Sequence, residues 1–339
     1  MTVRAFAPGR VNLIGDHVDY VGGLVLPMAV QLGTTVEFTA GGEVLAMRSG
    51  DRPEAARVPL PVSDPSTVQP EWARFPAGAA AEVGLATGGR VSVSTTLPIG
   101  SGMSSSSALT TAAVLAFGAA FDDPVAGAHL VRRAESLASG FESGLMDQLI
   151  ILGAQAGTAM LLDCRDETFR HLRLPEGLAV HAIHCGVERR LVGSEYATRR
   201  RSCEQAEAII GPLRDARLDD IDAIDDPETR RRARHVVTEI ERVRHAAEAC
   251  EAGDGAGLGE LMVASHRSLR DDFDVSIPEL DLLQERLCEI DGVHGARLTG
   301  AGFGGCVVAI ADEDVLDEVI GGWRLEPGGP ARSSRLELL

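Results

Sequence analysis

A short glycine- and serine-rich segment lies between a predicted strand and a predicted helix, and it limits the folds that the chain can adopt. The segment runs from Pro98 to Ala108 and reads Pro-Ile-Gly-Ser-Gly-Met-Ser-Ser-Ser-Ser-Ala. Val91 and Val93 alternate with small polar residues before it, and the apolar run from Leu109 predicts a buried helix. Glycines permit tight backbone turns and the first amides of a helix attract anions, so the segment predicts a phosphate-binding loop.

The four consecutive serines of this segment add hydroxyl donors and candidate ligands for a magnesium ion. A flexible linker has a similar composition. Linkers, however, seldom separate a strand from an apolar helix, and the phosphate-binding interpretation is therefore favoured over a linker.

The composition indicates a soluble globular chain with room for two domains. Of its 339 residues, 45% are hydrophobic and 24% are charged, and it has neither a run of eighteen apolar residues nor an N-terminal signal core. The six cysteines are scattered without CxxC spacing, which favours reduced thiols in a cytoplasmic protein. A net charge of -18 argues against nucleic acid or an anionic membrane as a partner, because both require a basic surface.

All 32 basic residues are arginines, because the chain contains no lysine. This excludes a Walker A P-loop and the lysine-dependent site of protein kinases. Any phosphate that the chain binds must therefore be held by arginine, backbone amides, hydroxyl groups and metal.

The pattern of elements divides the chain into a first half of strands and helices and a more polar second half. Tight turns after short strands are predicted at Pro8-Gly9, Gly15 and Gly22-Gly23. Helical patterns dominate residues 109–153, and further helices are predicted at 197–210, 227–252, 258–270 and 278–289. We therefore predict an N-terminal domain over residues 1–168 and a C-terminal domain over residues 169–339.

A turn near the N-terminus gathers polar side chains after an apolar strand. It contains one arginine, two aspartates, a histidine and a tyrosine, namely Arg10, Asp16, His17, Asp19 and Tyr20. Several fixed donors and acceptors on one loop suit a polyhydroxylated ligand. A solvated loop with an ion pair between arginine and aspartate is equally consistent with the composition.

Asp147 is a lone carboxylate just inside the start of an apolar helix, with Ser143 as a candidate cap. A helix N-terminus stabilises such a carboxylate as its anion, which can orient a hydroxyl group or accept its proton. An isolated acid at this place more often serves only the helix dipole. Glu135, on the preceding helix, is by similar reasoning a surface charge or a metal ligand. The nine histidines have no zinc spacing.

A second glycine-rich loop runs from Thr299 to Gly305 and leads into a β-branched strand. A dinucleotide-binding loop would be followed by a helix, so a Rossmann site is disfavoured. We expect this loop to close over the phosphate-binding segment and the polar turn.

In this order, the polar turn at 9–20, the serine segment at 98–108 and the glycine loop at 299–305 resemble the three signature motifs of the GHMP kinase superfamily. Within it, the chain is most similar to galactokinases, and the similarity spans nearly all of the sequence. Four further runs are galactokinase-like: Gly144-Leu-Met-Asp-Gln, Ser194-Glu-Tyr-Ala-Thr-Arg, Arg232-Ala-Arg-His-Val-Val and Ser265-His-Arg-Ser-Leu-Arg-Asp-Asp-Phe.

The resemblance implies a two-domain α+β fold with the active site between the domains. The N-terminal domain would be like domain 2 of ribosomal protein S5, and the C-terminal domain would be of the ferredoxin-like type. The implied reaction is transfer of the γ-phosphoryl group of ATP, with Mg²⁺, to the anomeric hydroxyl of galactose, as in the Leloir pathway.

The resemblance also implies roles for particular residues. The catalytic residues would be Asp147 and Arg10. The sugar would be held by Asp16, His17, Asp19, Gly144 and Tyr196. The triphosphate would be held by Pro98, Gly100, Ser101, Gly102, Met103, Ser104, Ser105, Ser106 and Gly302. Magnesium would lie near Ser105, Ser106 and Glu135.

Three departures from the family pattern leave the identity of the sugar open. Asp16 stands where the family has glutamate, His184-Cys185-Gly186 replaces a more polar stretch, and the segment before the first motif is shorter than is usual. The alternatives are a kinase for another sugar with the same fold, or a non-catalytic sensor of sugar and ATP. We expect a cytoplasmic protein that is a monomer or a weak homo-oligomer.

Overall fold

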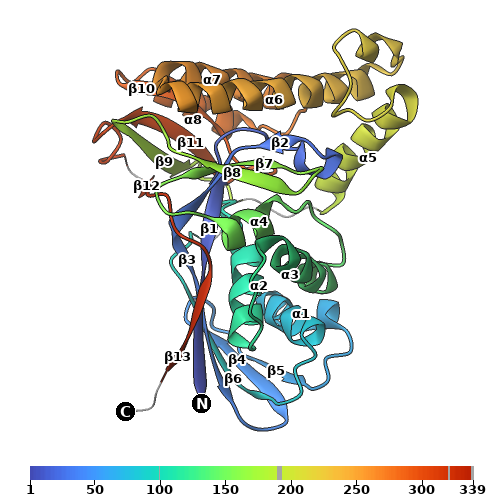
Figure 1. The fold of residues 1–339 in the computed structure, drawn as a ribbon, viewed down its shortest axis with the longest axis vertical. Helices are drawn as coiled ribbons and strands as arrows, with labels where there is room; N and C mark the ends of the chain where they lie inside the picture. The colour runs from blue at the N-terminus through green and yellow to red at the C-terminus, as the bar shows by residue number, and fades with distance from the viewer. Residues whose placement is uncertain (99, 189–192, 320, 337–339) are drawn as a thin grey trace.

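The N-terminal half is built on a six-stranded sheet whose one face is covered by helices (Figure 1). The computed structural model describes residues 1–98, 100–188, 193–319 and 321–336. In spatial order the strands are β13 (Arg332–Leu336), β1 (Thr2–Asn12), β3 (Pro27–Ala40), β6 (Gly89–Thr95), β4 (Val44–Ser49) and β5 (Ala56–Pro59). The helices of this half are α1 (Arg74–Glu82), α2 (Ser105–Ala116), α3 (Pro124–Ser139) and α4 (Met146–Gly153).

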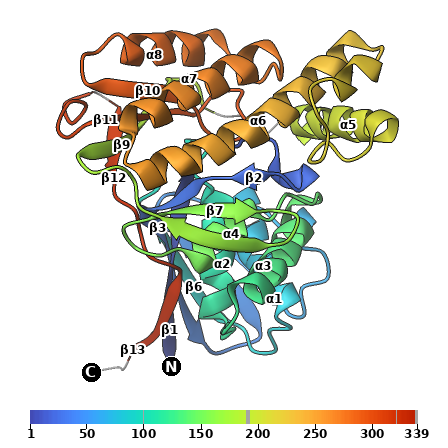
Figure 2. The same cartoon turned by 45° about the horizontal axis from the view of Figure 1, so that its top comes forward.

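The C-terminal half is a four-stranded antiparallel sheet with helices on its outer side (Figures 1 and 2). Its strands, in spatial order, are β10 (Val293–Leu298), β11 (Cys306–Asp312), β9 (Leu178–His184) and β12 (Gly322–Leu325). Its helices are α5 (Gly193–Ile210), α6 (Pro227–Ala252), α7 (Gly255–Asp271) and α8 (Pro278–Cys288). A small sheet of β2 (Leu24–Val25), β7 (Ala159–Asp163) and β8 (Thr168–Leu172) lies between the two halves.

Local signals account for the predicted helices, which the structure confirms. The side chain of Asp226 accepts a hydrogen bond from the N–H of Thr229, and Pro227 occupies the first position of α6. Gly253 ends the helix with a left-handed φ of 70°. An aspartate cap, a proline at the start and a glycine at the end are strong boundary signals, so the predicted range of 227–252 matches α6.

The turn predicted at Pro8-Gly9 is wrong, because β1 continues through both residues. The pairing of β1 with β3 shifts its register between Pro8 and Arg10, and a proline without an N–H group is tolerated at such an irregularity. Gly9 is required for close packing instead of a turn. A Cβ atom there would lie 2.4 Å from Leu97 Cδ2 and 2.7 Å from the carbonyl oxygen of Met103.

The last strand returns to the first sheet. β13 pairs antiparallel with β1, from Thr2 opposite Leu336 to Phe6 opposite Arg332. The predicted boundary between residues 168 and 169 falls within β8, which pairs with β7. The chain therefore passes from the first half to the second and back again, whereas two consecutive domains would need only one passage.

The elements on both sides of the serine segment have the burial that their patterns predict. Val91 and Val93 on β6 are buried between exposed neighbours, and α2 is buried from Ser107 to Ala116. Among the described helices, none combines the length and apolar character needed to cross a membrane.

Candidate active site

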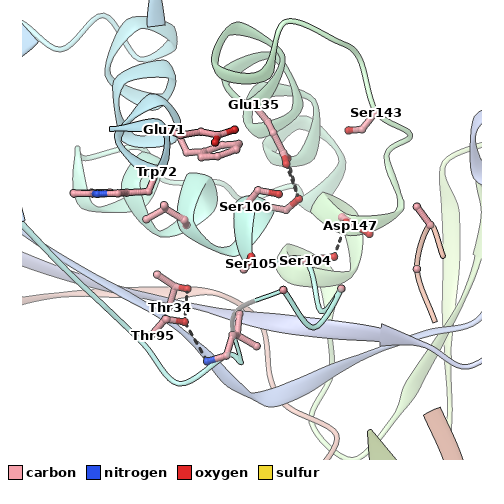
Figure 3. Close-up of a pocket in the computed structure, with 18 of the residues that line it drawn as sticks. Thr34, Glu71, Trp72, Thr95, Ser104, Ser105, Ser106, Glu135, Ser143 and Asp147 are labelled. Carbon is pink, nitrogen blue, oxygen red and sulfur yellow. Dashed lines mark hydrogen bonds between the residues drawn. The ribbon is translucent and has the colours of Figure 1, made fainter. Parts of the chain in front are cut away.

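A cleft of about 1270 Å³ is lined by residues of both halves of the molecule. Figure 3 shows one part of it, with Ser104, Ser105 and Ser106 near Glu135 and Asp147. All three segments singled out in the sequence contribute to its walls. The structure therefore brings together parts of the chain that are up to about 290 residues apart, as shown by the bond from Asn12 N–H to Thr299 Oγ1 across 287 positions.

Arg10 and Asp147 form a bidentate ion pair in this cleft. Nε of Arg10 donates to Oδ1 of Asp147 at 2.7 Å, and Nη2 donates to Oδ2 at 3.0 Å. The third donor, Nη1, is bound to the carbonyl oxygen of Gly102 at 2.8 Å. Arg10 is 4% exposed, whereas 24% of the Asp147 side chain is accessible. The guanidinium therefore orients a carboxylate that a ligand can still reach.

Asp147 lies in the first turn of α4, as predicted, but Ser143 does not cap that helix. The residue before α4 is Leu145, and its helix start has no side-chain cap among the described residues. The hydroxyl of Ser143 donates to the carbonyl oxygen of Gly144 at 3.1 Å instead. The local sequence thus predicted the place of the Asp147 carboxylate correctly, but its prediction that Ser143 caps the helix was wrong.

Ser104 connects the serine loop with Asp147. Its hydroxyl donates to Oδ2 of Asp147 at 2.5 Å, and its backbone is left-handed with a φ of 56° (Figure 3). Helix α2 begins at the next residue, Ser105. Gly100 and Gly102 have φ values of 73° and 79°, which only glycine adopts easily. The predicted tight loop before a helix is therefore present, and its end touches the candidate catalytic carboxylate.

The four serines have different surroundings, which the sequence did not distinguish. Ser104 is bound to Asp147, and Ser107 donates to the two carboxylate oxygens of Glu135 at 3.1 and 2.9 Å. Ser105 is exposed and Ser106 is partly exposed at the start of α2. Ser107 was not predicted as a site residue, because a run of identical residues gives no signal for which member faces which way.

Glu135 lies in a pocket of oxygen and amide groups. Burial raises the pKa of its carboxyl group, the charge of Asp147 adds to this, and hydrogen bonds with Ser106, Gln148 and Ser107 oppose it. Nε2 of Gln148 donates to Glu135 at 2.7 Å, while the buried Oε1 of Gln148 has no hydrogen-bond partner among the described residues. A hydrated divalent cation would offset the repulsion between the carboxylates and supply a donor for that oxygen, so these groups fit Mg²⁺.

Asp16 joins the N-terminal turn to the C-terminal half. It is 2% exposed, and its Oδ1 accepts from Asn12 at 3.1 Å and from the N–H of Gly300 at 3.3 Å. Its Oδ2 accepts from Nη2 of Arg297 at 2.5 Å. Burial raises the pKa of Asp16, and the charge of Arg297 counteracts this. The family resemblance predicted that Asp16 binds the sugar, and the sequence gave no sign of its bond to Arg297.

His17 occupies a strained turn beside the cleft, with a left-handed φ of 65°. Its Nε2 lies 3.2 Å from the carbonyl oxygen of Ala301, which can only accept, so Nε2 carries the proton. Its Nδ1 lies 3.3 Å from the hydroxyl of Tyr20. The ring packs near Tyr196 of α5, with the centroids 5.8 Å apart. Two of the predicted sugar residues thus meet across the halves of the molecule.

Asp19 and Gly144 are in close contact. A Cβ atom on residue 144 would lie 1.7 Å from Oδ2 of Asp19, so only glycine leaves room for this carboxylate. Burial raises the pKa of Asp19 to about 7, and the negative charges of Asp147 and Asp16 contribute to the shift. Asp147 and Asp16 therefore disfavour the ionisation of Asp19, in addition to its burial.

The C-terminal glycine loop packs against the serine loop, as expected. Gly305 is so close that a Cβ atom would lie 3.1 Å from the carbonyl oxygen of Ser101. Gly302 has a φ of 79°, and a Cβ atom there would lie 2.2 Å from the carbonyl oxygen of Val275. Glycine is therefore required at both positions for the loop to close.

The remaining part of the cleft has lining residues that sequence reasoning missed. Trp72 and Phe75 line it near the start of α1, and Thr34 and Thr95 line it from the sheet. The two threonine hydroxyls are 3.1 Å apart (Figure 3). These residues belong to no motif, and their positions depend on how β3, β6 and α1 come together.

Three family models match successive parts of the chain. The galactokinase galactose-binding signature matches residues 2–40, the GHMP kinases N terminal domain matches residues 74–154, and the GHMP kinases C terminal model matches residues 246–327. The two-domain α+β fold with a cleft between its halves, as the sequence led us to expect, is that of the GHMP kinases.

Similarity to galactokinases extends over most of the chain. The galactokinase of Bos taurus is 40% identical over 334 residues, which is 93% of this chain and 85% of the bovine protein. The galactokinase of Homo sapiens is 40% identical over 326 residues, with 90% of this chain and 83% of the human protein covered. The crystal structure of Lactococcus lactis galactokinase complexed with galactose has a TM-score of 0.89 at 28% identity, with 98% and 95% of the two chains covered. The chain belongs to the galactokinase family, which makes it a sugar kinase that uses ATP.

Proposed function

We propose that this enzyme transfers the γ-phosphoryl group of ATP to the anomeric hydroxyl of galactose. The observation that supports this best is the Arg10–Asp147 pair. It is bound to the serine loop through Gly102 and Ser104. The negative charge of Asp147 also adds to the effect of burial in raising the pKa of Asp19 on the polar turn. The match of the galactose-binding signature supports galactose as the sugar.

In the proposed reaction, Asp147 accepts the proton of the anomeric hydroxyl as its oxygen attacks the γ-phosphorus. A new O–P bond forms, the bond from the γ-phosphorus to the β-γ bridging oxygen breaks, and ADP leaves with that electron pair. Arg10 keeps Asp147 oriented and stabilises charge on the transferring group. This agrees with phosphoryl transfer in general, where positioning and charge neutralisation supply most of the catalysis.

We place the triphosphate on the serine loop. The N-terminus of α2, together with the glycines that precede it, provides a lysine-free anion site. The residues proposed to hold it are Pro98, Gly100, Ser101, Gly102, Met103, Ser104, Ser105, Ser106 and Gly302. The adenine base of ATP would then lie toward Trp72 and Phe75, where the cleft offers aromatic rings.

We propose that Mg²⁺ is held by Glu135 with Ser105 and Ser106 nearby. Among the described residues that line the cleft, nine are carboxylates and only three are arginines, so a polyphosphate needs a counter-cation there. No group of three or more histidine, cysteine, aspartate or glutamate residues in the described chain could form a metal cage alone. This suits Mg²⁺, which commonly combines one or two protein ligands with phosphate oxygens and water and neutralises the charge of the phosphates.

The sugar is proposed to contact Asp16, His17, Asp19, Gly144 and Tyr196. Of these, Asp19 and Tyr196 offer side chains that suit sugar hydroxyls, and Gly144 leaves the space that Asp19 needs. The carboxylate of Asp16 already accepts from three protein donors, so Asp16 is proposed to shape the buried side of the sugar site more than to bind sugar hydroxyls directly.

The affinity for the sugar should depend on pH through Asp19. Its carboxylate accepts sugar hydroxyls best when ionised, and its pKa is about 7 in the free protein. We therefore expect the KM for galactose to fall roughly tenfold between pH 6 and pH 8, while Asp19→Asn shows a weaker affinity without this dependence. A steady-state pH series checks this, and an equal pH dependence in the variant would contradict it.

The raised pKa of Asp19 also makes the free enzyme less stable to unfolding as the pH rises from about 4 to about 7.

Release of ADP, measured by a coupled assay across a panel of monosaccharides, tests the function itself. We expect the highest kcat/KM on galactose. Turnover of another aldose with little on galactose would favour a kinase for a different sugar. Binding of galactose and ATP without ADP formation would favour a sensor. Size-exclusion chromatography and cell fractionation would test the prediction of a cytoplasmic monomer or weak homo-oligomer.

A further inference from the structure

One face of helix α6 forms hydrogen bonds with the backbone of the turn at Gly15 and Asp16. Nε2 of His235 lies 3.1 Å from the carbonyl oxygen of Asp16, and Oε1 of Glu239 accepts the N–H of Gly15 at 2.9 Å. A Cβ atom on Gly15 would lie 2.9 Å from Cγ2 of Val243. The three helix residues are four positions apart, so they form a single stripe along α6. Figure 2 shows α6 running over β2, which flanks the same turn.

The hydrogen bonds of His235 define its tautomer. The carbonyl of Asp16 can only accept, so Nε2 must carry a proton. Nδ1 lies 2.9 Å from Oγ of Ser268, and Ser268 lies 3.3 Å from Asp272. Burial lowers the pKa of His235 to about 4, so the ring is neutral near pH 7 and its Nδ1 is an acceptor. The hydroxyl of Ser268 has one proton and two acceptors within reach, Oδ2 of Asp272 at 3.3 Å and Nδ1 at 2.9 Å, and with a neutral ring the shorter contact to Nδ1 takes that proton. His235 is 0% exposed, and both of its ring nitrogens are used.

Glu239 is held as an anion in the interior. It is 0% exposed, and besides Gly15 it accepts from Ser265 at 2.5 Å and from Nε of Arg242 at 2.7 Å. Burial opposes its ionisation, but the positive charge of Arg242 and other neighbours outweighs burial and lowers the pKa to about 2. A buried anion with three donors is a rigid acceptor for the backbone of the turn.

Phe273 extends this support to His17. Its ring centroid is 4.6 Å from that of His235 and 4.7 Å from that of His17. The left-handed backbone of His17 is unfavourable for a residue with a side chain and persists only where the surroundings fix it. The contacts of these tilted rings and the two bonds from α6 provide that constraint.

We propose that His235 and Glu239 are positioning residues that fix the turn from Gly15 to His17 and thereby set the affinity for the sugar. This inference rests on the proposed function, because it takes the cleft side of the turn as part of the sugar site. It also gives a role to the sequence runs that begin at Arg232 and Ser265, which the catalytic steps do not use. Because the support acts on the turn and not on the serine loop, it affects the sugar more than ATP.

Steady-state kinetics of His235→Phe, with galactose and ATP varied separately, provide the test. Phenylalanine keeps the ring but removes the donor to Asp16, so we expect the KM for galactose to rise about tenfold, equivalent to about 1.4 kcal/mol, with the KM for ATP within roughly twofold. His235→Gln retains an N–H donor near the position of Nε2 and should recover most of the affinity. His245→Phe, on an exposed part of the same helix, is the matched control and should change neither constant.

The wild-type assay on galactose separates this inference from the proposed function, because it tests turnover without any variant. If His235→Phe does not fold, as judged by its melting curve, Ser268→Ala takes its place. That variant removes the donor to Nδ1 and should raise the KM for galactose about threefold, with the KM for ATP unchanged. An equal rise in both KM values, an unchanged KM for galactose in a folded variant, or failure of His235→Gln to recover affinity would overturn the proposal.

Discussion

Replacement of Asp147 by asparagine is expected to lower kcat by roughly 10²- to 10⁴-fold, because a general base commonly contributes that much. The amide cannot accept the proton of the anomeric hydroxyl. It also cannot accept both bonds from Arg10, so the guanidinium loses one partner of the bidentate pair. The KM for ATP should stay close to that of the wild type, because the serine loop keeps its glycines and its backbone amides. Initial rates at saturating galactose and ATP measure the effect.

Glu142→Gln is the matched control for this substitution. Glu142 lines the same cleft and is exposed, so its variant loses one negative charge without loss of the proposed base. We expect its kcat to stay within about threefold of the wild type, since an exposed charge contributes little. If Asp147→Asn retained kcat at a similar level, Asp147 would not be the base.

Replacement of Gly144 by alanine should lower kcat/KM for galactose roughly 10²-fold, since a displacement of about 1 Å at a reacting site can have that effect. The new Cβ atom would lie 1.7 Å from Oδ2 of Asp19, so the carboxylate must leave its position. The backbone of Gly144 does not have a positive φ, and the loss would therefore come from the contact and not from backbone strain. The KM for ATP should change little, and the melting temperature should show that the variant is folded.

Gly329→Ala is the control for added volume at a glycine. Among the described residues, its new Cβ atom would meet only the Cβ of Ala156, at 4.0 Å, and Gly329 also lacks a positive φ. We expect its kinetic constants to match the wild type. Full activity of Gly144→Ala on galactose would show that the Asp19 carboxylate is not needed where the structure has it.

Some elements could be predicted from the sequence because their causes are local. The limits of α6 follow from Asp226, Pro227 and Gly253, which act on the residues next to them. The serine loop was recognisable for the same reason, since its glycines and the helix after it are neighbours in the chain. The family motifs then predicted which loops form the site.

Other features depend on segments that are far apart in the chain and leave no local trace. The bonds from His235 to Asp16 and from Glu239 to Gly15 join positions 219 and 224 residues apart. Gly9 was taken for a turn residue because its real constraint, the approach of Leu97 and Met103, is invisible in the sequence around it. Trp72 was missed because it lines the cleft without belonging to a motif.

The pairing of β13 with β1 has a consequence for the order in which the molecule forms. β1 leaves the ribosome well before β13, because the two strands are far apart in the chain. Until residues 332–336 have been synthesised, the outer edge of β1 has unpaired backbone groups that are able to pair with another chain. The N-terminal sheet therefore stays open at this edge until β13 has been made, and the nascent chain is exposed to misassembly there before β13 pairs with β1.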